Sequence, residues 1–187
     1  MFDLTYPTAV WIALGVALFW SVGAYNRLVR LRSTALVSFQ VLGEALAGYG
    51  VLVNDCFPAA SSVPMQSALT LDGAAAANWV GLQAASTQFD ASLQVARRQP
   101  LDAAGMAALQ TALVVLQAAW RRAPSGFVER PQVPAATLQS QWSERDQQVA
   151  HATAAFNRAV LAYNAAVAQF PAALIARLFA LRGAGCL

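Results

Sequence analysis

The feature that most constrains this chain is an uncharged apolar stretch near its start. Residues 4–26 carry no charged side chain and lie between Asp3 and Arg27. At about 1.5 Å per residue, 23 helical residues exceed the ~20 needed to cross the hydrocarbon core of a bilayer. Pro7 fits the first helical position, where its missing N–H would have no intrahelical partner. The sequence therefore predicts a transmembrane helix followed by a domain outside the bilayer.

Two other interpretations of this stretch are a secretory signal peptide and a buried core helix. A signal peptide begins with positive charge and ends at a small-residue cleavage site, whereas this start carries Asp3 and no basic residue. A core helix is compatible with a chain in which 58% of the residues are hydrophobic. Core helices, however, seldom stay uncharged for this length and then meet an arginine cluster. A membrane span fits both the length and the flanks.

Three arginines follow the stretch directly, at Arg27, Arg30 and Arg32. They outweigh the single acidic residue before the span, and basic residues beside a span stay on the cytoplasmic side. We therefore expect residues 1–26 to form the anchor, with the N-terminus outside, and residues 27–187 to form a cytoplasmic domain. The three arginines should lie at the membrane surface, against anionic lipid headgroups.

The composition indicates the cellular location of the protein and argues against some classes of partner. All twelve basic residues are arginine, and the chain is rich in alanine, as in a GC-rich bacterial genome. We therefore expect a single-pass protein of the bacterial inner (cytoplasmic) membrane. The net charge of +3 comes with no dense basic stripe, which argues against nucleic-acid binding. Cys56 and Cys186 are isolated, so we expect unpaired thiols and no metal site.

Helical periodicity continues after the span. Apolar and small residues recur at alternating steps of three and four from Leu28 to Leu52, which is the period of a helix packed in a bundle. No proline interrupts residues 8–57, so the span and this segment should form one helix of about 70 Å. Further long helices are expected at residues 69–98, 102–122 and 135–170, the second with Asp102 as its N-cap.

The predicted fold class is all-α, because no run of alternating apolar and polar residues indicates a sheet. Four long helices with shorter connections favour an antiparallel, up-down-up-down four-helix bundle into which the transmembrane helix continues. Phe170 should then lie near the membrane-side start of the first helix, around residues 25–28. The proline-rich connections at residues 54–66 and 123–134 should lie together at the distal end.

A short amphipathic helix is expected at residues 172–182. Its large apolar residues lie opposite two arginines. One interpretation is a cap on the end of the bundle, and the other is a helix that lies in the lipid headgroup region. The positions that would contact the membrane surface are Leu174, Leu178 and Phe179.

No group of residues in the sequence supports a catalytic or cofactor-binding site. His151 is the only histidine, Asp146 lies off its helical face, and no nucleophile accompanies it. The nine carboxylates are scattered, with no i, i+4 pair that suggests a di-metal site. We therefore expect a protein that is not an enzyme, with no catalytic residue, cofactor, metal or small-molecule substrate.

Two arginine pairs resemble binding sites, Arg97–Arg98 and Arg121–Arg122. Each pair ends a predicted helix, where the helix dipole favours cations by about 0.3–1 kcal/mol. This stabilising role is the simpler interpretation. A lipid contact is the alternative for the first pair.

Two further patterns each have competing interpretations. Asn157 and Asn164 either hydrogen-bond across helices and fix their register or face solvent. Ala13, Ala17 and Ser21 form a small-residue stripe in the span. Such a stripe lets another span approach closely, and it also arises by chance in an alanine-rich chain.

Both ends of the chain resemble the LemA family. The segment Tyr25-Asn-Arg-Leu-Val-Arg-Leu-Arg32 is similar to the family's start after its span. The runs Phe156-Asn-Arg-Ala-Val-Leu-Ala-Tyr-Asn164 and Phe170-Pro-Ala-Ala-Leu-Ile-Ala-Arg-Leu-Phe179 resemble its closing signature. The middle of the chain departs from the family pattern, so it looks like a divergent member. The positions that carry the signature are Tyr25, Asn26, Tyr163, Asn164, Phe170, Pro171, Leu174, Ile175 and Ala176.

The resemblance implies a helical bundle with an N-terminal anchor and a cytoplasmic body, and it implies no particular reaction. The family includes MamQ-like magnetosome proteins, which are associated with shaping an internal membrane. We therefore expect a non-enzymatic scaffold or adaptor that presents its bundle to protein partners or to itself and contacts membrane lipids. The alternative is a regulatory or sensory subunit of a neighbouring membrane enzyme or complex.

Overall fold

The computed structural model describes residues 5–56, 73–123, 135–169, 173, 176 and 183–187. Over these residues the protein is all-α, as predicted, and contains no strand. The long helices and their bounds are α1 (Thr5–Cys56), α3 (Gly73–Arg98), α4 (Ala103–Arg122) and α5 (Ala135–Ala168).

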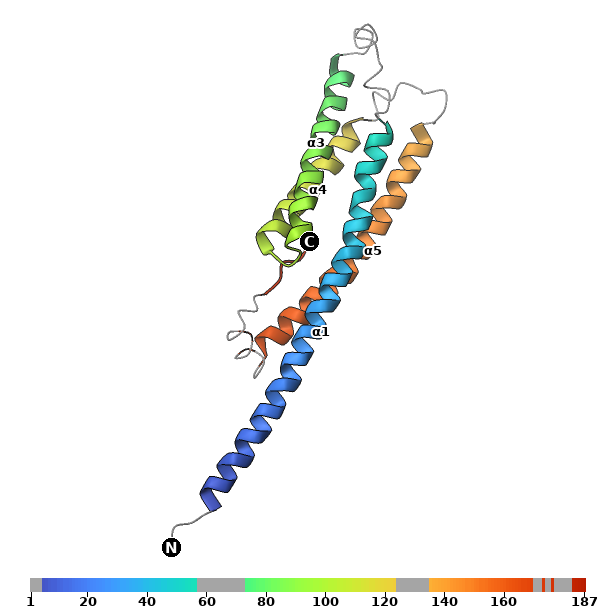
Figure 1. Ribbon diagram of the computed structural model, residues 1–187. Coiled ribbons are helices and arrows are strands. Elements are labelled where there is room, and N and C mark those ends of the chain that lie inside the picture. Colours follow the sequence, from blue (N-terminus) through green and yellow to red (C-terminus); the bar gives the residue numbers. More distant parts are fainter. Residues whose placement is uncertain (1–4, 57–72, 124–134, 170–172, 174–175, 177–182) are drawn as a thin grey trace.

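Helix α1 is one continuous element of 52 residues. At about 1.5 Å per residue it is close to 78 Å long, which confirms the single long helix expected from the absence of internal proline. It begins at Thr5, two residues before Pro7, so the proline lies in the first turn but not at its first position. The first turn has no intrahelical acceptors for its N–H groups, and Pro7 is therefore tolerated there. In Figure 1 the N-terminal half of α1 extends beyond the other helices.

Helices α1 and α5 pack side by side over most of the length of α5 (Figure 1). Leu28 of α1 clusters with Ala166 of α5. Further along α1, the ring of Phe39 meets Phe156 edge-to-face with centroids 5.6 Å apart. Residue numbers rise on α1 as they fall on α5, so the two helices run in opposite directions. The predicted neighbour of this region, Phe170, lies outside the described residues.

Helices α3 and α4 form a second pair, joined by a short turn. Asp102 is the N-cap of α4, as predicted, and its Oδ2 accepts a hydrogen bond of 2.7 Å from the Gly105 N–H. Helix α3 also packs against α1, where the rings of Phe89 and Tyr49 meet edge-to-face at 6.3 Å. The Arg97 guanidinium donates a 2.8 Å hydrogen bond to the Gly43 carbonyl of α1. This interhelical bond is a role that the sequence interpretation of Arg97 missed.

One hydrophobic cluster fills the space among the four helices. The indole rings of Trp120 on α4 and Trp142 on α5 stack with centroids 4.1 Å apart and planes 7° apart. Most stripe positions predicted from the 3.5-residue period are buried, as are three further hydrophobic residues of α1. The buried stripe of α1 is therefore wider than predicted, because this helix packs against α5 and α3 at once. The three additional buried hydrophobic residues are Phe39, Leu46 and Val53.

The predicted helix at residues 172–182 falls largely outside the described residues. Ala173 and Ala176 are helical, the Ala173 N–H bonds the Gln169 carbonyl at 2.8 Å, and Ala176 is buried. The positions expected at the membrane surface, Leu174, Leu178 and Phe179, lie outside the description, as do Phe170, Pro171 and Ile175. The segment Gly183–Leu187, which we term the tail, is described and has no regular secondary structure.

Candidate functional site: an exposed apolar anchor and an asparagine clasp

The N-terminal part of α1 presents large apolar side chains outward. From Val10 to Arg27 every residue is exposed or half-buried, and Leu28 is the first buried one. Phe19 is 84% exposed and Trp11 is 71% exposed. A soluble protein rarely exposes a contiguous apolar surface of this kind. The exposed half of α1 therefore has the pattern of a segment surrounded by lipid.

Two helices in the described part of the chain are long and apolar enough to cross a membrane. One is α1, and the other is α4. Helix α4 buries one face in the protein core through Met106, Leu109, Ala112, Leu116 and Trp120. We therefore assign α4 to the core and take α1 as the candidate anchor.

The predicted membrane-surface arginines lie where α1 enters the protein body. Arg27, Arg30 and Arg32 are all exposed, and they flank the buried Leu28. Burial raises the pKa of the Tyr163 phenol on α5, while the nearby positive charge of Arg32 opposes that rise. The C-terminal part of α5 thus reaches the level of the arginines. Tyr25 and Asn26, the start of the family-like segment, are exposed just before them.

The small-residue stripe in the span is exposed or half-buried. Ala13 and Ala17 face outward, and Ser21 donates a 2.7 Å hydrogen bond to the Ala17 carbonyl of its own helix. This bond satisfies the hydroxyl within the helix, as apolar surroundings require. Packing against another span stays a prediction.

Asn157 and Asn164 on α5 hold the tail. The Asn164 side chain accepts a 2.7 Å bond from the Ala184 N–H and donates a 2.9 Å bond to the Ala184 carbonyl. The Asn157 side chain does the same with Leu187, at 3.0 and 2.8 Å. We call these two side chains the asparagine clasp. Neither interpretation from the sequence included this role, because the partners are backbone groups of a segment 20 and 30 residues away.

The other side of the tail touches the turn between α3 and α4, and the C-terminus lies beside that turn in Figure 1. The Gly185 N–H donates a 3.3 Å bond to the Leu101 carbonyl. A Cβ at Gly185 would lie 2.6 Å from the Ala103 Cα. The tail is therefore held between the two helix pairs by hydrogen bonds to its backbone.

A polar contact lies within the aromatic core. The Tyr49 ring is fully buried, and its hydroxyl donates a hydrogen bond to Oδ1 of Asp146. Burial, followed by the bond to Asp146 and its negative charge, raises the pKa of Tyr49, and a bond with Gln117 opposes this. The sequence placed Tyr49 on the core stripe but gave no sign of its partner.

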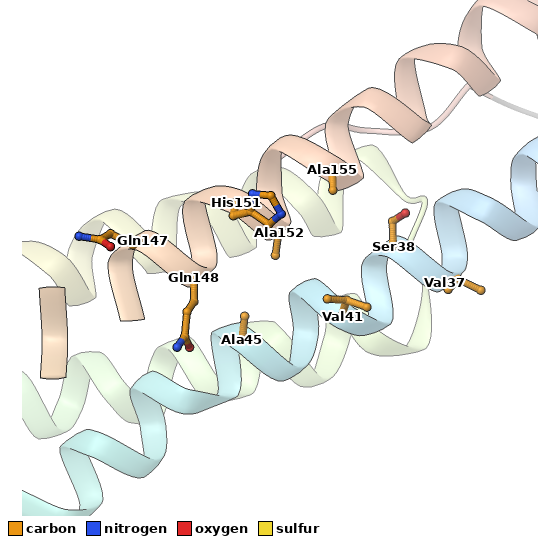
Figure 2. Close-up of a pocket in the computed structure, with 9 residues that line it drawn as sticks. All are labelled: Val37, Ser38, Val41, Ala45, Gln147, Gln148, His151, Ala152 and Ala155. Atoms are coloured by element: carbon orange, nitrogen blue, oxygen red, sulfur yellow. The ribbon is translucent and has the colours of Figure 1, made fainter. Parts of the chain in front are cut away.

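An apolar groove of about 600 Å³ lies between α1 and α5. Figure 2 shows its lining residues on the two helices, with His151, whose side chain is exposed, at the rim. His151 is the sole titratable residue among them, so the groove offers shape and apolar contact without a second acid–base group. The lining comprises Val37, Ser38, Val41, Ala45, Gln147, Gln148, His151, Ala152 and Ala155.

Within the described residues, no group of three or more His, Cys, Asp or Glu side chains could hold a metal ion. Cys186, in the tail, is exposed and free.

The sequence model of the LemA family matches residues 95–186. The chain belongs to the LemA family. In this LemA-family protein the matched range starts at the end of α3 and includes α4, α5, the asparagine clasp and most of the tail. Neither a curated protein nor a solved structure matches the chain significantly. Family membership and the exposed apolar half of α1 together support a membrane-associated protein.

Proposed function

We propose that this LemA-family protein is a non-enzymatic, single-pass membrane-anchored scaffold or adaptor. The observation that carries the proposal is the continuity of α1, which runs unbroken from exposed apolar residues into the buried core at Leu28. A continuous helix transmits position and direction, whereas a flexible linker would not. The body is thereby held at a set height and orientation relative to the bilayer. Holding other molecules at such a position is the task of a scaffold.

The proposed arrangement divides the chain into an anchor, residues 1–26, and a body, residues 27–187. The body is an antiparallel four-helix bundle with coiled-coil-like packing, supported by the opposite directions of α1 and α5 and by the α3–α4 hairpin. It lies in the cytoplasm beneath a bacterial inner membrane, with the N-terminus outside. The exposed arginines after the span support this orientation, because basic residues stay on the cytoplasmic side.

Two kinds of surface would serve the scaffold. Arg27, Arg30 and Arg32 contact anionic lipid, each contributing about 1 kcal/mol near a charged leaflet. The groove between α1 and α5 and the exposed Val114 and Val115 of α4 offer apolar contact to protein partners or to another copy. Membrane contact by Leu174, Leu178 and Phe179 stays a prediction from the sequence.

Topology is tested by reporter fusions after Leu187 in intact cells. A reporter that is active only in the cytoplasm should work, and one that needs export should not. Replacing the three arginines with glutamine should disturb insertion or orientation and leave the helical content of the body unchanged. An active exported reporter would overturn the orientation, and an unfolded body would make the arginines structural.

The scaffold role is tested by cross-linking intact membranes, followed by mass spectrometry. A scaffold should be recovered with itself or with one set of partners in fixed stoichiometry. Recovery in no fixed stoichiometry, together with a changed activity of a neighbouring membrane enzyme, would favour a regulatory or sensory subunit instead.

A further inference from the structure

The asparagine clasp holds the tail through the tail's backbone groups. Each amide side chain pairs with both the N–H and the carbonyl of one residue, Asn164 with Ala184 and Asn157 with Leu187. A neighbouring β-strand would offer the same pair of groups. In peptide-binding domains that add a strand, such main-chain bonds supply affinity and side-chain pockets supply specificity.

The contacts of the tail define which peptide the clasp accepts. Ala184 is buried against the hydrophobic core, and Leu187 packs at its edge, while Cys186 points to solvent. Gly185 is required, because a Cβ there would lie 2.6 Å from the Ala103 Cα, a backbone atom that cannot move independently. The accepted pattern is therefore a small residue, then glycine, then any residue, then an aliphatic residue.

We propose that the asparagine clasp is a peptide-binding site that takes the tail of a second copy of this chain in exchange for its own. The second copy carries the same tail, so its fit to the clasp is already shown by the intramolecular contact. Exchange of an identical element between copies is a low-cost route to dimers. The inference rests on the proposed scaffold function, for which it supplies the mode of self-association.

Chain length and anchoring make the exchange feasible. Fifteen residues, 169–183, join the end of α5 at Ala168 to Ala184. Even if all of them were helical, at about 1.5 Å per residue they would span about 22 Å, beyond the 8–10 Å between packed helices. Copies held by α1 in one membrane share a plane and an orientation, so each clasp meets neighbouring tails at a high effective concentration.

Two complementary full-length variants test the exchange. The acceptor carries Gly185→Ala, which leaves the clasp intact and prevents its own tail from fitting into a clasp. The donor carries Asn157→Ala and Asn164→Ala, which remove the clasp and keep the tail. Neither variant can close on itself or pair with its own kind, whereas the donor's tail fits the acceptor's clasp.

The variants carry different affinity tags, are co-expressed in membranes and are recovered in mild detergent through one tag. We expect the mixed pair to co-purify at least tenfold more than acceptor with acceptor or donor with donor. Adding Gly185→Ala to the donor should abolish the gain. Equal recovery of all pairs, or a mixed pair unaffected by this added change, would overturn the proposal.

A second donor variant controls for the possibility that the alanine substitutions disrupt folding. In Asn157→Asp with Asn164→Asp, the carboxylates keep the shape and still accept from the N–H groups, but they cannot donate to the carbonyls. This donor should behave like the first if the proposal is right, and a failure to pair with the acceptor while its circular dichroism matches the wild type would refute it. Membrane recovery of each variant, measured in parallel, reports on anchoring alone, so the scaffold proposal can survive if tail exchange fails.

Discussion

The Tyr49 hydroxyl on α1 donates a hydrogen bond to the carboxylate of Asp146 on α5, although 97 positions separate them in the chain. The same tyrosine ring lies 4.7 Å from Trp142 and meets Phe89 of α3 edge-to-face. One residue of the anchor helix therefore contacts two other helices at a single level. This contact ties the C-terminal half of α1 to the rest of the body.

Tyr49→Phe should destabilise the body. The change keeps the ring and removes the hydroxyl, so a partly buried carboxylate of Asp146 loses its donor. We expect a loss of about 1–3 kcal/mol in the free energy of unfolding, measured by denaturant titration of the full chain in micelles. Val51→Ala, at an exposed position of the same helix, is the matched control and should change stability by less than about 0.5 kcal/mol. Equal midpoints for Tyr49→Phe and the wild type would contradict the prediction.

Stability should fall at alkaline pH because of the same tyrosine. Burial and the neighbouring Asp146 raise the pKa of Tyr49 above its ordinary value of 10.0. Above pH 10 the unfolded chain loses this proton while the folded chain keeps it, so the folded state binds more protons. The free energy of unfolding should therefore be unaffected by this group below pH 10 and decrease above it by about 1.4 kcal/mol per pH unit.

The matched comparison is the same pH series on Tyr49→Phe. Above pH 10 the free energy of unfolding of this variant should decrease less steeply with pH than that of the wild type. The decrease should not vanish, because burial also raises the pKa of Tyr163. Identical slopes for the two proteins would show that Tyr49 does not cause the alkaline loss.

Periodicity in the sequence was enough to predict most of the architecture. The helices, the N-cap at Asp102 and the long uninterrupted α1 follow from local rules of spacing, capping and proline placement. The extra buried positions of α1, such as Phe39 and Leu46, could not be predicted in this way. They are buried because α1 packs against both α5 and α3, and a helix's own sequence does not specify how many neighbours it has.

The site was less predictable because its partners are remote in the chain. Asn157 and Asn164 were recognisable as a repeated polar pair, but their partners are backbone groups, which carry no sequence signal. Glycine inside a helix is by itself destabilising. In the structure Gly48 and Gly50 are places where side chains of α5 and α3 approach closely. Their position in the half of α1 that carries the predicted apolar stripe could have indicated this close packing.

Two glycine-to-alanine changes should have opposite effects. At Gly81 of α3 a Cβ would have open space, so Gly81→Ala should stabilise the protein by about 0.5–1 kcal/mol through helix propensity. At Gly50 a Cβ would lie 2.9 Å from Oδ1 of Asp90, so Gly50→Ala must displace that carboxylate. We therefore expect Gly50→Ala to leave the stability unchanged or to lower it. Thermal unfolding midpoints of the two variants, measured in parallel, check this. A higher midpoint for Gly50→Ala than for Gly81→Ala would be inconsistent with close packing of α1 against α3.

The boundary between anchor and body can be tested with a pair of cysteines. Leu28 and Ala166 are both buried and form a small cluster of their own, apart from the main core. Leu28→Cys with Ala166→Cys, in a chain with Cys56 and Cys186 replaced by alanine, should therefore cross-link in intact membranes with a short thiol reagent. This result is expected because α5 runs beside α1 toward its exposed apolar half and ends next to the arginines.

The control pair joins the same Leu28→Cys to Val149→Cys. Val149 lies in the main core and lines a cavity with Tyr49, far along α1 from Leu28. The two positions should fail to cross-link under conditions in which the first pair reacts fully, as judged by a mobility shift on denaturing gels. If the control pair reacted and the first pair did not, α5 would run parallel to α1. The body would then meet the membrane with the opposite end of α5.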